Sequence, residues 1–195
     1  PRLQAQGPGA GGSKVEVEGT RALRATYFST QFFVHLQKTD GKGYERVMRE
    51  GGRRTDIFEY DTVFIPINHK EKKHWSLAII NLMAERLEFY DSMGEDGETY
   101  LNLLLEYMQQ KNADNAHKGK RTLDWVSKPM EDLFFSAGNQ APQQSSSGGD
   151  CGVFVCQYAN FLSQGIPLWP ESPLTRNMNY YRKRMVIELC SGCIL

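Results

Sequence analysis

The sequence predicts a fold of the α+β class, because helix-like and strand-like segments follow one another without a regular alternation. Short apolar runs rich in β-branched residues cluster in the middle of the chain, and residues with helical spacing precede and follow them. A Gly/Ser-rich stretch then leads into a last group of helical patterns. We therefore expect a sheet built from the central residues, with helices contributed by both ends of the chain.

Three strand-like runs form the centre of the chain. Residues 62–67 (TVFIPI) are apolar and β-branched, and residues 75–82 (WSLAIINL) are almost continuously apolar, as in a buried strand. Residues 86–91 (RLEFYD) alternate between apolar and polar side chains. Because only a few residues separate the second run from the third, we expect these two to form a hairpin.

Apolar residues at helical spacing predict longer helices on both sides of these strands. In the first helix, Phe28, Phe32, Phe33 and Leu36 would face the core. A further edge strand is expected just before Pro129, in the sequence LDWVSKP. The predicted helices span residues 27–38, 98–112, 151–165 and 177–190.

The length of 195 residues suits one domain with a loose tail. Residues 1–20 are Gly-rich and hold few large apolar side chains, so we expect a low-complexity or disordered leader there and a folded domain over residues 21–195. No apolar signal segment and no run of membrane-spanning length is visible, so no membrane association is expected.

The charge balance and the cysteine content exclude several classes of protein. Lys plus Arg and Asp plus Glu number 23 each, which argues against a nucleic-acid binder driven by bulk electrostatics. Four cysteines are too few for a disulfide scaffold, so we expect reduced thiols in the cytosol or nucleus. Cys190 and Cys193 have ligand-like spacing, but no second compact pair stands nearby, so neither a metal nor another cofactor is expected.

Cys151 is the candidate nucleophile. A catalytic cysteine reacts as a thiolate, and a free cysteine has a pKa of about 8.5, which a helix N-terminus or a neighbouring imidazolium lowers. Cys151 follows a Gly/Ser-rich loop and opens an apolar helical run, with Asp150 at the expected N-cap and with Gly149 and Gly152 leaving room for a substrate. An isolated cysteine is more often a core residue, and we keep that interpretation for Cys156.

His74 and Asp91 are the candidate base and its orienting acid. A catalytic cysteine needs a histidine within hydrogen-bond reach, itself held by a third group. A hairpin turn centred near residues 82–83 would place these two residues opposite each other, and a shift of one residue would keep them close neighbours. Each alone would read as a surface or turn residue. The remaining histidines lack such a placed acid and are assigned no catalytic role: His35, His69 and His117.

A developing oxyanion needs a hydrogen-bond donor besides the backbone N–H of Cys151. Gln143 and Gln144 stand shortly before Cys151 in the loop, and a side-chain amide there can supply that donor. Without the other three residues, both glutamines would read as plain loop residues. We choose Gln144 and keep Gln143 as the alternative.

These motifs together resemble the Ulp/SENP family of SUMO-specific cysteine proteases, whose catalytic residues follow the same order of His, Asp, Gln and Cys. The resemblance covers roughly residues 27–191. It rests on HW at 74–75, FYDSMG at 89–94, PQQ at 142–144 and GDCGVF at 149–154, together with TDIF at 55–58, VFIPI at 63–67 and YYRKRM at 180–185.

The resemblance implies a papain-like fold with a central mixed sheet flanked by helices. It also implies cleavage after the C-terminal Gly-Gly of SUMO, in the precursor and at isopeptide bonds to lysine, and a nuclear or nucleocytoplasmic location. A monomer is the default expectation. SUMO and SUMO-conjugated proteins would be its partners. By the same resemblance, Trp75 would cover the tunnel for the Gly-Gly tail, and Asp56 and Phe58, joined by Arg53 and Arg54, would dock SUMO. We add Gly149 and Asp150, next to the nucleophile, to the substrate-binding residues.

Two departures from the family pattern keep alternatives open. The Trp-Leu-Asn/Asp helix that forms the other tunnel wall has no counterpart before Tyr27. Gln144 lies seven positions before Cys151, whereas the family's glutamine lies six positions before its cysteine. Ser145 occupies the position six before Cys151. A flexible loop accommodates one additional residue at small entropic cost. The alternatives are a catalytically weak pseudoprotease that binds SUMO, and a protease for another ubiquitin-like modifier.

Overall fold

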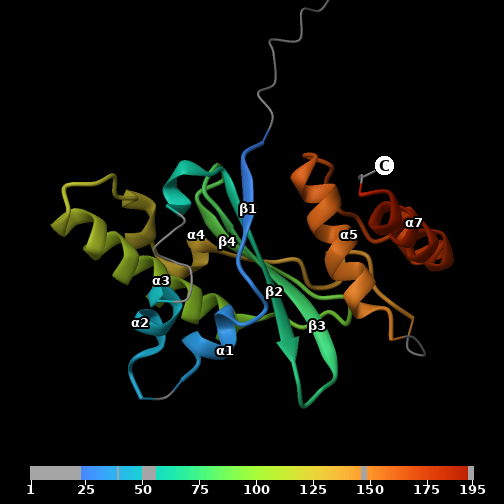
Figure 1. Ribbon diagram of the computed structural model, residues 1–195, viewed down its shortest axis with the longest axis horizontal. Coiled ribbons are helices and arrows are strands. Elements are labelled where there is room, and N and C mark those ends of the chain that lie inside the picture. Colours follow the sequence, from blue (N-terminus) through green and yellow to red (C-terminus); the bar gives the residue numbers. More distant parts are fainter. Residues whose placement is uncertain (1–22, 39, 50–55, 146–148, 193–195) are drawn as a thin grey trace, which may run out of the picture.

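A five-stranded mixed sheet forms the centre of the molecule (Figure 1). The computed structural model describes residues 23–38, 40–49, 56–145 and 149–192. The strands lie in sequence order across the sheet, with the outer pairs β1–β2 and β4–β5 parallel and the inner pairs antiparallel. Their bounds are β1 Ala25–Tyr27, β2 Thr62–His69, β3 His74–Asn81, β4 Arg86–Tyr90 and β5 Phe134–Ser136.

Helices cover both faces of this sheet. Figure 1 shows α5 and α7 on one side and α1, α2 and α3 on the other. The principal helices are α1 Phe32–Leu36, α2 Gly43–Val47, α3 Glu98–His117, α5 Cys151–Ser163 and α7 Met178–Ser191. Short pieces complete the described part: α4 Met130–Leu133, α6 Pro173–Arg176 and the 3-10 turns η2 Ile57–Glu59, η3 Asp124–Ser127 and η4 Gly138–Gln140.

The alternation of side chains along β2 divides the core into two parts. Val63, Ile65 and Ile67 pack into the cluster that includes α1 and α3, whereas Phe64 packs into the cluster that includes α5 and α7. Successive side chains of a strand point to opposite faces, so a sheet covered on both sides needs apolar residues at nearly every position. This explains why the runs at residues 62–67 and 75–82 carry so little polar character.

Two local expectations from the sequence are wrong. Of the stretch predicted as one helix over residues 27–38, only Phe32–Leu36 is helical. Tyr27, at its start, instead ends strand β1, because the backbone of Ala25–Tyr27 pairs in parallel with Thr62–Phe64. The edge strand expected before Pro129 is the 3-10 turn η3, whose Trp125 and Val126 are buried in the core. The edge strand on that side is β5, which begins after α4.

Gly97 fixes the start of α3 against the sheet. Its backbone has φ +69°, and a Cβ placed on it would lie 2.1 Å from the Cγ of Phe89 in β4. A side chain at this position therefore meets both an unfavourable backbone conformation and the ring of a fully buried phenylalanine. Only glycine lets the first turn of α3 lie this close to β4.

We expect Gly97→Ala to destabilise the protein far more than Gly119→Ala, which serves as the matched control. Gly119 has a similar φ of +62°, but a Cβ placed on it would meet no atom of the described residues within 4 Å. The backbone cost alone is about 1–2 kcal/mol for either variant, and overpacking against Phe89 should add about 1–3 kcal/mol. Urea unfolding of the two variants measures the difference, and equal midpoints would contradict this account.

Candidate active site

The start of β3 and the start of α5 lie side by side at one end of the sheet. His74 and Trp75 open β3, and Cys151 and Gly152 open α5. A Cβ placed on Gly152 would lie 3.9 Å from the Cδ1 of Trp75, which puts the two element starts in van der Waals range. Cys151 itself is largely buried, with 6% of its surface exposed. The predicted nucleophile and the predicted base therefore belong to neighbouring element ends.

His74 and Asp91 form a buried hydrogen bond. The Nε2 of His74 lies 2.7 Å from the Oδ2 of Asp91, and both side chains are buried. Leu77 pairs with Tyr90 across β3 and β4, so the turn is centred one residue later than expected and Asp91 lies diagonal to His74. A diagonal pair is still within reach of a long side chain. With Nε2 engaged by the carboxylate, Nδ1 is the ring nitrogen left for a thiol.

Asp91 is held in place by the segment that follows β4. Its Oδ1 accepts a hydrogen bond from the backbone N–H of Met93 at 2.5 Å, and its carbonyl accepts one from the N–H of Gly94 at 3.2 Å. One carboxylate oxygen of Asp91 therefore accepts a hydrogen bond from the turn that follows β4, and the other is hydrogen-bonded to His74. This arrangement orients the imidazole in the way that a third catalytic residue must.

The two glutamines in the loop have different environments. The side-chain Nε2 of Gln143 lies 3.0–3.1 Å from three carbonyl oxygens, those of Asp91, Gly138 and Ala141. Gln144 instead donates its backbone N–H to the carbonyl of Ser92 at 2.9 Å. The side chain of Gln144 forms no hydrogen bond with any residue in the described part of the chain, and its Oε1 is buried. The side chain of Gln143 thus holds the loop in place, whereas the side chain of Gln144 does not.

Asp150 occupies the N-cap position of α5 but does not cap it. Its carboxylate accepts the Nε–H of Arg182 in α7 at 3.0 Å and also pairs with the Nη2 of the same arginine. Arg182 also donates to the carbonyl of Gly149 at 3.3 Å. The expected side-chain cap is therefore wrong, because the guanidinium is the stronger partner for this carboxylate. The first two N–H groups of α5, on Cys151 and Gly152, have no carbonyl acceptor within the helix.

The residues expected to bind substrate lie in two places. Trp75, Gly149 and Asp150 lie at the ends of β3 and α5 described above. Asp56 and Phe58 lie just before the first residue of β2. Phe58 is buried in the core with 5% of its surface exposed. A side chain buried in this way does not fit the expected docking role, and Asp56 is paired with Lys120 at 3.5 Å. Arg53 and Arg54 lie outside the described residues.

Sequence reasoning missed two residues near the site, Arg182 and His69, and considered a third, Gln143, only as an oxyanion donor. Gln143 clamps the loop, Arg182 ties the start of α5 to α7, and His69 packs its ring 5.5 Å from that of His74. The sequence places no acid beside His69, so it gives no direct sign of a role. A usable signal is nevertheless present, since the four residues between His69 and His74 suit a tight hairpin that brings the two histidines opposite each other.

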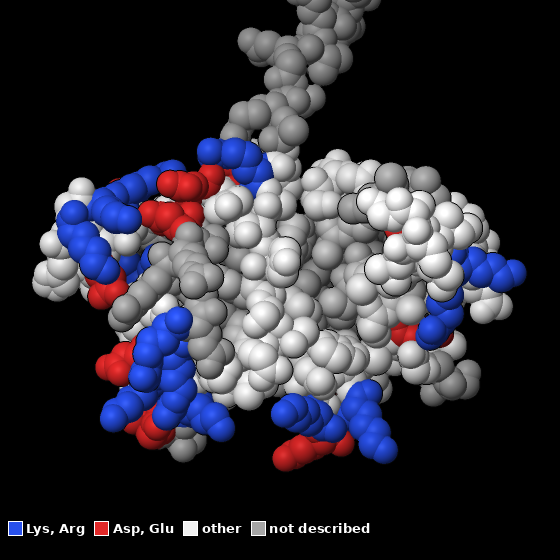
Figure 2. All heavy atoms as spheres, viewed as in Figure 1, with Lys and Arg blue, Asp and Glu red and all other residues white. Residues whose placement is uncertain are grey.

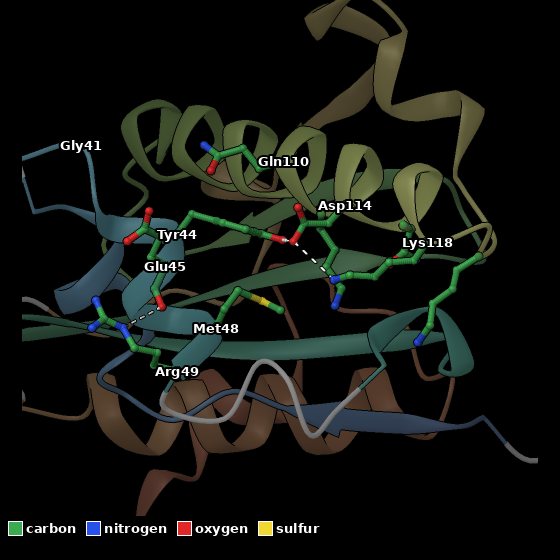
Figure 3. Close-up of a pocket in the computed structure, with 11 residues that line it drawn as sticks. Gly41, Tyr44, Glu45, Met48, Arg49, Gln110, Asp114 and Lys118 are labelled. Carbon is green, nitrogen blue, oxygen red and sulfur yellow. Dashed lines mark hydrogen bonds and ion pairs between the residues drawn. The ribbon is translucent and has the colours of Figure 1, made fainter.

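Two further hollows lie away from these residues. A cavity of about 830 Å³ lies between α2 and α3 (Figure 3), where the hydroxyl of Tyr44 donates to Asp114 at 2.8 Å. Burial lowers the pKa of Lys111, which also lines it. The second hollow, about 440 Å³ and mostly apolar, lies between β1 and α5, under the uncharged surface in the middle of Figure 2. Neither is lined by His74, Asp91, Gln144 or Cys151.

The described residues offer neither a metal site nor a membrane-spanning helix. Within residues 23–38, 40–49, 56–145 and 149–192, no group of three or more His, Cys, Asp or Glu side chains is arranged to hold a metal ion. Over the same residues, no helix has both the length and the apolar character needed to cross a membrane.

Several known proteins are similar to this chain over most of its length. Sentrin-specific protease 2 of Mus musculus is 33% identical over 175 residues, which cover 88% of this chain and 26% of that protein. The sentrin-specific protease of Caenorhabditis elegans is 32% identical over 169 residues, covering 86% of this chain and 22% of that protein. The chain thus spans about a quarter of the length of these curated relatives.

Solved structures show the same fold. The C-terminal Ulp1 protease domain in complex with Smt3, the yeast ortholog of SUMO, superposes with a TM-score of 0.60 at 24% identity, covering 85% of this chain and 69% of that one. The catalytic domain of a Chaetomium thermophilum Ulp1-like SUMO protease gives a TM-score of 0.57 at 25% identity, covering 82% and 58%. The expected α+β protease fold is confirmed.

A family model provides the last comparison. The model of the Ulp1 protease family, C-terminal catalytic domain, matches residues 13–192, which is most of the chain. The match includes the His74–Asp91 pair, the loop with its two glutamines and the start of α5 at Cys151. The chain belongs to the Ulp1 protease family.

Proposed function

We propose that this chain is a thiol protease that cleaves after the C-terminal Gly-Gly of SUMO, both in the precursor and at isopeptide bonds to lysine. The observation that carries the proposal is the buried His74–Asp91 hydrogen bond beside the first turn of α5, where Cys151 lies. Membership of the Ulp1 family supports the protease activity. The relatives named as sentrin-specific proteases and the Ulp1 domain in complex with Smt3 support SUMO as the substrate.

In the first half of the reaction, His74 takes the proton of the Cys151 thiol on Nδ1 while Asp91 holds Nε2. The thiolate attacks the carbonyl carbon of the terminal glycine, and the charge that develops on oxygen is stabilised by the Gln144 amide and the Cys151 N–H. His74 then protonates the leaving amine, which departs as lysine or as the C-terminal peptide. A thioester between SUMO and Cys151 remains.

In the second half of the reaction, water hydrolyses the thioester. Neutral His74 removes a proton from the water as it attacks the carbonyl, and Cys151 leaves as a thiolate. The products are SUMO with a free C-terminal carboxylate and the resting thiolate–imidazolium pair. We propose that Trp75, half-buried beside Gly152, covers the Gly-Gly tail, and that the exposed Gly149 leaves room for the substrate next to the thiol.

The partners and location follow from the same proposal. SUMO and SUMO-conjugated proteins are the partners, with Asp56 and Asp150 as the charged substrate-binding residues. We also propose, from the family resemblance, that the chain acts in the nucleus or in both nucleus and cytoplasm. We propose a monomer as the default state of a single domain. Light scattering of the purified chain tests the monomeric state, since a mass twice that of one chain would contradict it.

Substitution of the three central residues tests the catalytic assignment. Cys151→Ala and His74→Ala should abolish cleavage of a SUMO C-terminal fluorogenic substrate, because they remove the nucleophile and its base. Asp91→Asn should lower kcat/KM by about 10²–10⁴-fold, because an amide cannot hold the protonated imidazole equally well. Cys156→Ala, a second cysteine on α5, is the control and should keep wild-type activity. Wild-type turnover by Cys151→Ala would refute the assignment.

The two glutamines should differ in the kind of defect they cause. Gln144→Ala should lower kcat by about 10²–10³-fold, as expected for loss of an oxyanion donor, with an unchanged melting temperature. Gln143→Ala should lower the melting temperature, because three carbonyl groups lose their shared donor. Calorimetry and steady-state kinetics on both variants separate these outcomes. The assignment fails if Gln144→Ala is fully active or if the two defects are reversed.

A covalent probe distinguishes the proposed enzyme from the two alternatives. SUMO carrying a C-terminal electrophile should form an adduct with the wild-type chain, detected by intact mass, and no adduct with Cys151→Ala. Probes built on ubiquitin and on other ubiquitin-like modifiers run in parallel, and preferential reaction with one of them would reassign the substrate. A folded chain that binds SUMO without reacting would be a pseudoprotease.

A further inference from the structure

A second buried histidine lies directly across the β2–β3 hairpin from His74. His69 ends β2 and is the register partner of His74, which begins β3. The two ring centroids are 5.5 Å apart with an interplanar angle of 33°, and His69 is buried. The ring of His69 therefore flanks the ring of His74 at the end of the sheet where Cys151 lies.

Both ring nitrogens of His69 are anchored. Nε2 lies 2.7 Å from the Oγ of Ser76 in β3, and Nδ1 lies 3.0 Å from the hydroxyl of Tyr100 in α3. Each contact joins a ring nitrogen to a hydroxyl group, which can either donate or accept a hydrogen bond. The two contacts therefore hold the ring in either neutral tautomer.

The surroundings of His69 keep it neutral. Burial is the main cause that lowers the pKa of His69, and the charge of neighbouring His74 lowers it further. Among the other charged groups, Asp91 and Glu95 act to raise this pKa, and Lys72 acts to lower it. Lys38, Lys70 and Glu71 line the open hollow beside the ring. The carboxylate of Asp91 hydrogen-bonds His74 and not His69, whose two ring nitrogens contact hydroxyl groups.

We propose that His69 is a positioning residue for His74. Its ring, fixed at both nitrogens by Ser76 and Tyr100, supports one side of the His74 imidazole, so that Nε2 stays on Asp91 and Nδ1 stays directed at the thiol of Cys151. Because it is neutral, it gives this support without repelling the imidazolium that forms during catalysis. The inference rests on the proposed catalytic role of His74.

The geometry gives a physical reason why such support matters. The hydrogen bond to Asp91 fixes one atom of the His74 ring, but it leaves rotation about that bond open. A displacement of about 1 Å at a reacting group costs up to about 10²-fold in rate. A rigid second ring on the flank of the first restricts that rotation. In the described structure only His69 is in ring contact with His74.

Three variants and one control test the role of His69. His69→Gln removes the ring, and Tyr100→Phe removes the bond to Nδ1 while keeping the aromatic packing. His69→Lys adds a positive charge beside His74. His117→Gln, at the exposed C-terminal end of α3, is the control. The measurements are kcat and KM for SUMO cleavage between pH 5 and 9, the rate of Cys151 alkylation by iodoacetamide over the same range, and the melting temperature.

His69→Gln should lower kcat about tenfold with little change in KM, and it should slow alkylation of Cys151. Tyr100→Phe should show a smaller loss of the same kind. His69→Lys should move the alkaline limb of the pH profile to lower pH, because a neighbouring cation makes the imidazolium lose its proton earlier. The control should behave like the wild type in every measurement.

The outcomes separate this inference from the proposed function. If His69→Gln and Tyr100→Phe lower only the melting temperature and leave kcat, alkylation and the pH profile unchanged, His69 is a packing residue and the inference is overturned. The proposed function would survive that result. If the wild-type chain neither cleaves SUMO nor shows rapid alkylation of Cys151, the proposed function fails and this inference fails with it.

Discussion

The pairing of β3 with β4 is the constraint on which the site depends. Four residues connect the paired ends Asn81 and Arg86, and this turn length places Asp91 diagonal to His74. Since a shift of one residue in a strand turns every side chain to the other face, a turn one residue longer or shorter would break the hydrogen bond and also misplace the core residues of β4. The apolar pattern of the strand and the chemistry of the site therefore specify the same register.

The same strand end organises the loop that carries the candidate oxyanion donor. At the end of β4 and just beyond it, the carbonyls of Phe89, Asp91 and Ser92 accept hydrogen bonds from the backbone of Ala137, from the Gln143 side chain and from the Gln144 backbone, respectively. On the other side, the hydroxyl of Tyr158 in α5 donates to the carbonyl of Pro142. The loop is thus fixed between the end of β4 and the body of α5. The position of its amides follows from the sheet rather than from the loop sequence.

The sequence predicted those parts that depend on local pattern and short separations. The central strands follow from their apolar runs, and the His74–Asp91 pair follows from hairpin geometry over 17 residues. The remaining features depend on contacts between distant segments. Strand β1 forms because Ala25–Tyr27 pairs with β2. Asp150 does not cap α5 because its carboxylate binds Arg182, which lies 32 residues away in the sequence. The pattern of residues within a short stretch of sequence does not indicate partners that lie far away in the chain.

The chain between Gln144 and Cys151 is one residue longer than the resemblance predicts, and each of these two residues is anchored to a different part of the molecule. Gln144 stands seven positions before Cys151 instead of the six expected from the resemblance. Its backbone is anchored upstream, to Ser92, and Gln143 beside it is anchored to Asp91. Cys151 is anchored separately, by the helix it opens and by the Arg182 contacts to Gly149 and Asp150. Because these anchors do not involve the intervening chain, one more residue between Gln144 and Cys151 is compatible with the catalytic roles proposed for both.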